Sequence, residues 1–145
     1  MLPPLRKFAS LSREERLLLC TSAVLLCACR ALLAVVGLDR ARRVVALLVA
    51  ISPPFGGVED PEHVAWAVAC ANAYLPGSGT CLSQAVVGAA LLAAHGYPAT
   101  VRLGVAKPGA AVEAHAWVER EGTVVVGELS DLDRYRRLSS WTVDP

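Results

Sequence analysis

The chain has 145 residues and a net charge of +1 at neutral pH. A chain of this length can bury a real core, so one domain over residues 1–145 needs neither a disulfide nor a metal to fold. The small net charge predicts no strong electrostatic field, so nothing in the composition indicates nucleic acid or an acidic surface as a partner.

Five cysteines are present: Cys20, Cys27, Cys29, Cys70 and Cys81. Their number is odd, none forms a CxxC pair, and no secretory signal precedes them. These features indicate free thiols in a reducing, cytoplasmic environment. A zinc site needs paired ligands at close spacing, and the nearest approach is the single pair at positions 27 and 29, so we expect no metal.

Residues 1–75 are expected to be mainly helical. Ser12 and Glu15 fit a capping box, which predicts a helix from about Arg13 to Val36. A second helix follows over about 39–51. The third begins at Asp60-Pro61 and extends to about Tyr74, because proline suits the first helical position.

The segment Leu17–Val36 is almost entirely apolar and long enough to span a bilayer. Arg30 lies inside it, however, and a central arginine costs about 2.5–3.5 kcal/mol on insertion. The segment also lacks the small-residue cleavage site of a signal peptide. We therefore expect a buried helix rather than contact with a membrane.

Cys81 begins the fourth predicted helix, which ends before Gly96 and follows the turn-rich loop Leu75–Thr80. A nucleophilic cysteine reacts as the thiolate, and the free amides and dipole of a helix N-terminus favour an anion. The amide of Cys81 could also hold an oxyanion, although a second donor is not identified. The alternative is that Cys81 is a small buried apolar residue.

The pattern then changes to strands, over about Ala99–Val105, Val112–Glu119 and Thr123–Glu128. Residues 129–145 form a polar tail that Trp141 anchors. Helices followed by an antiparallel sheet define an α+β domain.

Three histidines could serve as the base. His95 ends a helix and His63 lies on one, whereas His115 begins a strand. If Glu121-Gly122 is a two-residue turn, Glu128 faces His115 across the hairpin. Glu128 could then hold one ring nitrogen, as the third member of a catalytic triad does.

Other carboxylates remain possible for this role. Glu119 shares the face of His115 but lies further along the strand, and Asp131 could fold back from the tail. A one-residue change of register would place Gly127 or Leu129 opposite His115 instead. Glu128 could also be a solvated strand end without this role.

Three motifs in 76–128 carry a family resemblance: Gly-Thr-Cys81-Leu-Ser-Gln-Ala, the segment Gly96–Val105, and Ala-His115-Ala-Trp-Val-Glu119. They resemble the leader peptidases of lasso peptide biosynthesis, which have a transglutaminase-like fold related to that of papain-like peptidases. The resemblance implies that Cys81 is the nucleophile and His115 the general base and acid. The family's carboxylate after the next strand, often aspartate, is matched most nearly by Glu128.

The resemblance also implies a function. Such enzymes cleave the leader from a ribosomally synthesised precursor peptide without a cofactor. A separate leader-recognition protein is expected as partner, because residues before Cys81 already form helices of this domain, and an ATP-dependent macrocyclase would take the product. Part of Leu17–Val36 could dock the partner, or that helix could be entirely core. The rival functions are acyl transfer to an amine and an interaction module with an inert thiol.

Overall fold

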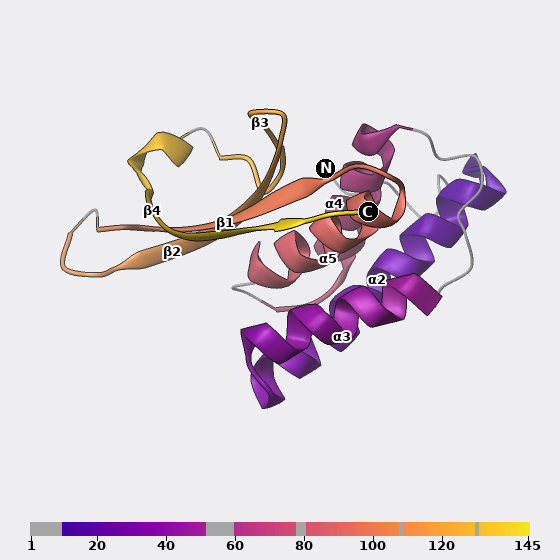
Figure 1. Cartoon of the computed structure of the whole chain (residues 1–145), viewed down its shortest axis with the longest axis horizontal. Coiled ribbons are helices and arrows are strands. Elements are labelled where there is room, and N and C mark those ends of the chain that lie inside the picture. Colours follow the sequence, from indigo (N-terminus) through magenta and orange to yellow (C-terminus); the bar gives the residue numbers. More distant parts are fainter. Residues whose placement is uncertain (1–9, 52–59, 78–80, 108, 130) are drawn as a thin grey trace.

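The computed structural model describes residues 10–51, 60–77, 81–107, 109–129 and 131–145. Within them, the chain folds into helices followed by an antiparallel sheet, which confirms the expected α+β arrangement (Figure 1). The helices are α2 (Arg13–Val35), α3 (Leu38–Ile51), α4 (Pro61–Tyr74) and α5 (Cys81–Ala94). The strands are β1 (Ala99–Ala106), β2 (Glu113–Arg120), β3 (Thr123–Val126) and β4 (Arg136–Val143), with a short 3-10 helix at Leu132–Arg134.

The helix starts follow the capping residues. The Ser12 hydroxyl accepts from the Glu15 amide at 3.1 Å, and the Glu15 carboxylate accepts from the Ser12 amide at 2.9 Å. At α4, the Asp60 carboxylate accepts from the Glu62 amide at 2.9 Å. Both caps satisfy amides that have no partner inside the helix. Residues 78–80 of the expected loop before Cys81 lie outside the described residues.

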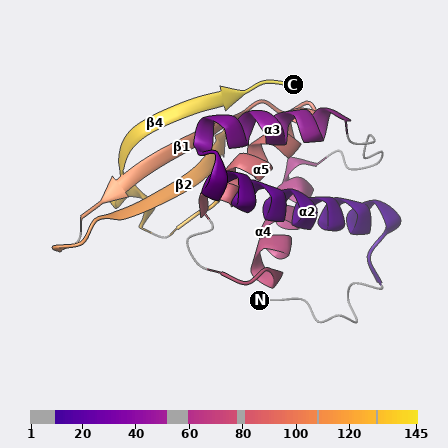
Figure 2. The same cartoon turned by 90° about the horizontal axis from the view of Figure 1, so that it is seen from below.

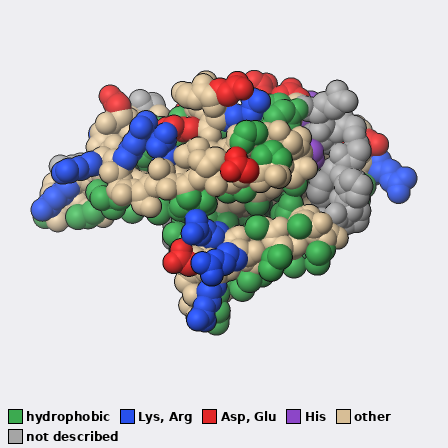
Figure 3. Space-filling model, viewed as in Figure 1, with side chains coloured by type: hydrophobic (Ala, Val, Ile, Leu, Met, Phe, Trp, Pro, Cys, Tyr) green, Lys and Arg blue, Asp and Glu red, His purple; other side chains and the backbone are tan. Residues whose placement is uncertain are grey.

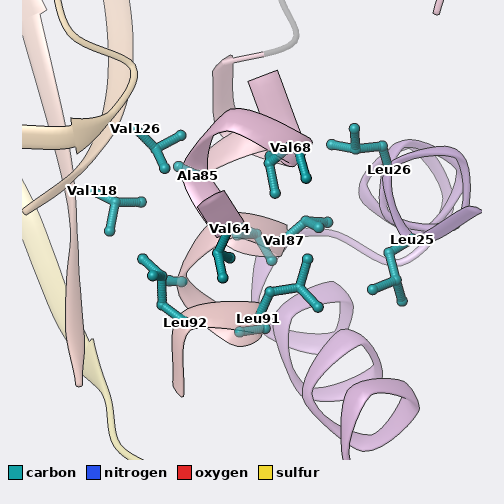
Figure 4. Packing of buried hydrophobic residues seen from close by; sticks show 14 of the residues in the cluster. Leu25, Leu26, Val64, Val68, Ala85, Val87, Leu91, Leu92, Val118 and Val126 are labelled. Carbon is teal, nitrogen blue, oxygen red and sulfur yellow. The ribbon is translucent and has the colours of Figure 1, made fainter. Parts of the chain in front are cut away.

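Helix α5 is the centre of the molecule. The helices lie on one side of the sheet, with α5 against it (Figure 2). Val118 and Val126 project from the sheet toward Ala85 and Leu92 of α5, and the leucines of α2 approach α5 from the other side (Figure 4). Gly88 lets the strand come close, because a Cβ there would be 3.1 Å from the Val126 side chain.

The expected tail is largely a strand. Residues Arg136–Val143 form β4, which pairs antiparallel with β1 at the edge of the order β3-β2-β1-β4. Its side chains are mostly exposed polar groups, which is why the sequence resembles a tail. Trp141 does anchor the segment, because it pairs with Val101, packs on the core and stacks under Arg42 at 5.1 Å.

Helix α2 has a buried face and an exposed apolar face. Leu18, Leu25 and Leu26 are buried in the core, whereas Leu17 and Val24 are 51% and 68% exposed. Hydrophobic side chains also gather along the lower edge of Figure 3, over α3. Because Leu17 and Val24 are exposed, helix α2 is not entirely core. By length and composition it could cross a membrane, a test that core helices and signal sequences also pass.

Candidate active site

Cys81 is the first residue of α5 and is half-buried against the core. The expected position at a helix N-terminus is thus confirmed. Unpaired backbone amides and the positive end of the helix dipole lie at this end. The position suits a group that develops negative charge during a reaction.

Arg30 holds the chain segment that leads to Cys81. Its guanidinium donates to the Pro76 carbonyl and to the Asn72 side-chain oxygen, both at 2.8 Å. These bonds tie α2 to the end of α4, a few residues before α5 begins. From the sequence, Arg30 served only as an argument against a membrane span. A single charge inside an apolar run is the signal for such a role, because a buried charge needs partners, but it does not show which ones.

His115 lies near the start of β2, on the face of the sheet that turns away from α5. Strand side chains alternate, and its neighbours Ala116 and Val118 belong to the core beside α5. The His115 ring instead stacks with Trp117, with centroids 6.0 Å apart, and meets the tilted Tyr135 ring at 5.6 Å. Aromatic rings on two sides therefore fix the imidazole.

The Nε2 atom of His115 lies 2.6 Å from the Gly127 carbonyl oxygen. A carbonyl can only accept, so in the neutral ring this bond requires the proton on Nε2 and leaves Nδ1 as the basic nitrogen. The bond gives the imidazole a defined tautomer. A carboxylate has this role in a Ser-His-Asp triad.

The hairpin only partly follows the expected register. Glu121 and Gly122 both have positive φ, 53° and 78°, and form the expected two-residue turn. Glu119 pairs with Val124 as expected, but an irregularity then shifts the register, so that Val126 pairs with Val118 rather than with Trp117.

This shift removes the predicted contact of Glu128. The pairing of β3 ends at Val126, and the exposed Glu128 has neither a hydrogen bond nor an ion pair with His115 in the described structure. Gly127 takes its place. A Cβ at Gly127 would meet the Ala116 carbonyl at 2.9 Å, so only glycine brings this carbonyl so close to β2.

The two other carboxylates pair with arginines. Asp131 binds Arg134 at 2.6 Å. Glu119 accepts from Arg102 at 2.6 Å and from the Trp117 indole at 2.9 Å. Burial opposes ionisation of Glu119, but these hydrogen bonds and the nearby arginine charges outweigh it and lower its pKa. Neither carboxylate contacts His115 among the described residues.

Cys81 and His115 lie toward the same end of the α5–sheet unit without touching. Beyond the other end of α5, the Tyr97 ring lies 4.7 Å from the Arg120 guanidinium at the end of β2. Gly88, midway along α5, packs on Val126, whose partner is Val118. Cys81 lies about 10 Å before Gly88 along α5, and His115 lies about 10 Å before Val118 along β2. No described hydrogen bond joins them, and His115 points to the opposite face.

Two of the remaining thiols are less suited to react. Burial raises the pKa of Cys29 to about 11 and also raises that of Cys70. Both stay protonated near neutral pH, whereas Cys20 and Cys27 are exposed on α2. Within the described part of the chain, no group of three or more His, Cys, Asp or Glu side chains could hold a metal ion.

The arrangement matches a known family. The family model for the transglutaminase-like superfamily matches residues 23–140, which is most of the chain. The chain therefore belongs to the transglutaminase-like superfamily, whose fold is that of cysteine peptidases and acyltransferases. Comparisons with curated proteins and with solved structures gave no match.

Proposed function

We propose that this protein is a cytoplasmic cysteine peptidase that removes the leader from a lasso peptide precursor. The observation that carries the proposal is the combination of Cys81 at the N-terminus of α5 with a histidine whose Nε2 is held by a carbonyl. The leader peptidase motifs around Cys81 and His115 support the choice of substrate.

The reaction needs His115 and Cys81 in contact. In the structure His115 points away from Cys81, so the proposed reaction requires the exposed start of β2, beside the projecting β1–β2 hairpin, to shift together with the Gly127 carbonyl and bring Nδ1 to Cys81 (Figure 1). Nδ1 then takes the thiol proton, and Sγ forms a bond to the scissile carbonyl carbon. When the C–N bond breaks, His115 returns the proton to the leaving amine.

Water completes the cycle. His115 removes a proton from a water molecule, which attacks the thioester carbon and releases the leader as a carboxylic acid. The thiol of Cys81 recovers its proton, and the core peptide leaves with a new amino terminus. If an amine replaced water at this step, the product would be an amide conjugate, as in acyl transfer.

The proposal includes two protein partners. A separate leader-recognition protein presents the precursor, and an ATP-dependent macrocyclase consumes the product. The leader-recognition protein docks on the exposed face of α2, where Leu17, Val24 and Ala31 repeat at heptad spacing and suit a helix of another chain.

Product masses test this function. A candidate precursor peptide from the same genomic neighbourhood is incubated with the protein, with and without an excess of a primary amine. A free leader acid under both conditions supports hydrolysis. Conversion of the leader to the amide conjugate would instead identify an acyl transferase.

A further inference from the structure

A groove runs between α4 and the edge strand β3. Its volume is about 400 Å³, and its walls are Ala65, Trp66 and Ala69 of α4, with Val124 and Val125 opposite them. Trp66 is 37% exposed, which is unusual for so large an apolar side chain. Small residues on one wall and valines on the other leave room for apolar side chains of a bound chain.

A second hollow of about 290 Å³ adjoins the groove, because Glu62 and Trp66 line both. Its other walls are Glu15, Asp60 and His63; the two carboxylates accept backbone amides and lie 3.6 and 3.9 Å from the His63 ring nitrogens. The Glu62 carboxylate has no hydrogen bond or ion pair within the described residues. This hollow therefore combines an acidic lining with a carboxylate that has no partner among the described residues and lies beside an indole ring.

The carboxylate of Glu62 and the indole of Trp66 suit a ligand group that carries a cation at the end of an apolar chain. Glu62 and Trp66 are one helical turn apart and share a face of α4. A carboxylate attracts an ammonium or guanidinium group, while the indole face binds the same cation and its methylene chain. Lysine and arginine are the side chains that match both features.

The adjacent sheet edge favours an extended ligand. Strand β3 is the outer strand in the order β3-β2-β1-β4, so its outer backbone groups have no strand partner within the described sheet. An extended peptide can pair with such groups while alternate side chains enter a groove. The groove thus fits a peptide segment better than a compact small molecule.

Both walls of the groove lead to the candidate active site. Helix α4 ends at Tyr74, shortly before Cys81 in the chain, and β3 is followed by Gly127, which binds His115. Val126 follows the groove residue Val125 and packs on Gly88 of α5. Cys81 lies about 10 Å before Gly88 along α5, a distance that about three extended residues cover.

We infer that the groove between α4 and β3 binds an extended segment of the peptide substrate and places a lysine or arginine of that segment between Glu62 and Trp66. The inference rests on the proposed peptidase function and adds a specificity site to it. Apolar residues next to the cation occupy the groove against Val124 and Val125. The cation lies several residues from the scissile bond, on one side of it.

The kinetic test removes positive charges from the peptide and the negative charge of Glu62 from the protein. Each lysine and arginine of the precursor peptide is replaced by alanine in turn, and the peptides are cleaved by wild type and by Glu62→Gln. One replacement should raise KM about tenfold with little change in kcat, and this effect should vanish in Glu62→Gln. Equal KM ratios in wild type and Glu62→Gln at every position would overturn the inference.

A binding test does not depend on catalysis. The probe is the labelled precursor peptide, with its alanine-substituted forms, titrated into Cys81→Ala by fluorescence anisotropy. Loss of affinity in Cys81→Ala/Glu62→Gln and in Cys81→Ala/Trp66→Ala, with recovery in Cys81→Ala/Trp66→Phe, supports the groove even if no cleavage is ever seen. Cleavage without any Glu62 dependence supports the peptidase and rejects the groove.

The controls separate charge from folding. Glu14→Gln removes a neighbouring exposed carboxylate that lines neither hollow, and it should leave KM and affinity unchanged. Thermal unfolding of every variant is compared with wild type. An equal loss of affinity in Glu14→Gln and Glu62→Gln would mean that only general acidity attracts the peptide, which also contradicts the inference.

Discussion

The carbonyl oxygen of Gly127 lies 2.6 Å from Nε2 of His115, where a carboxylate was expected. The bond sets the tautomer of the imidazole and leaves Nδ1 as its basic nitrogen. In the proposed mechanism the orienting role therefore falls to a backbone group, which no carboxylate-to-amide substitution can remove.

Gly127→Ala should lower kcat while a matched control does not. Gly127 has a φ of +80° and its Cβ position is blocked by the Ala116 carbonyl at 2.9 Å, so alanine must move the carbonyl from His115. Gly122→Ala meets nothing within 4 Å and has a similar φ of +78°. Both variants suffer the strain of positive φ, about 1 kcal/mol. Steady-state kinetics should show a loss of about tenfold or more in Gly127→Ala alone. Equal kcat values in the two variants would contradict the role of Gly127.

Glu128→Gln should leave kcat within about threefold of wild type, because the exposed carboxylate has no described contact with His115. Asp131→Asn, which removes the ion pair with Arg134, is the companion variant. Each is compared with His115→Ala in the same peptide cleavage assay. A large drop in Glu128→Gln, close to that of His115→Ala, would restore Glu128 as the third member of the triad.

Alkylation should distinguish the five thiols. Iodoacetamide reacts with thiolates, and burial keeps the pKa of Cys29 at about 11 and raises that of Cys70, so these two should react slowly at pH 7. Cys81 begins a helix and should react faster than the exposed Cys20 and Cys27. Peptide mapping after short labelling times gives the rates. A faster reaction at Cys20 or Cys27 would indicate an inert Cys81.

Glu119 should stabilise the folded protein at neutral pH, and this contribution should be lost in acid. Its pKa is lowered in the folded state, so its contribution is present above the unfolded pKa of about 4.3 and is lost as the pH falls through the folded value. Glu119→Gln should cost about 1–3 kcal/mol at pH 7, because Arg102 and Trp117 lose a charged acceptor. Urea unfolding from pH 7 to pH 3 should bring the variant and wild type together. A constant difference across this range would be inconsistent with the lowered pKa.

Val24→Asp should weaken binding of the leader-recognition protein without unfolding the chain, because Val24 is 68% exposed on α2. Val112→Asp is the matched control, since Val112 is a 64% exposed valine on the loop between β1 and β2. A pull-down with the leader-recognition protein should retain Val112→Asp and lose Val24→Asp. Normal capture of a folded Val24→Asp would count against docking on α2.

The helices could be predicted because their ends are encoded locally. Ser12, Glu15 and Asp60 form the caps that the sequence indicates, and Cys81 begins α5 as expected. The turn at Glu121-Gly122 could also be predicted from its glycine and from the strands around it.

The details at His115 could not be predicted. The irregularity next to Val125 depends on how the sheet packs on α5, and three consecutive valines give no sequence signal of register. The polar strand β4 forms because β1 offers a free edge, which the local sequence does not show. The same tertiary packing sets the face that His115 takes.

The most direct test of the account is mass spectrometry of the precursor peptide after incubation with wild type or Cys81→Ala, each with and without the leader-recognition protein. The account predicts cleavage at one bond by wild type and none by a folded Cys81→Ala. Cleavage by Cys81→Ala at the same rate, or no cleavage by folded wild type under either condition, would contradict it.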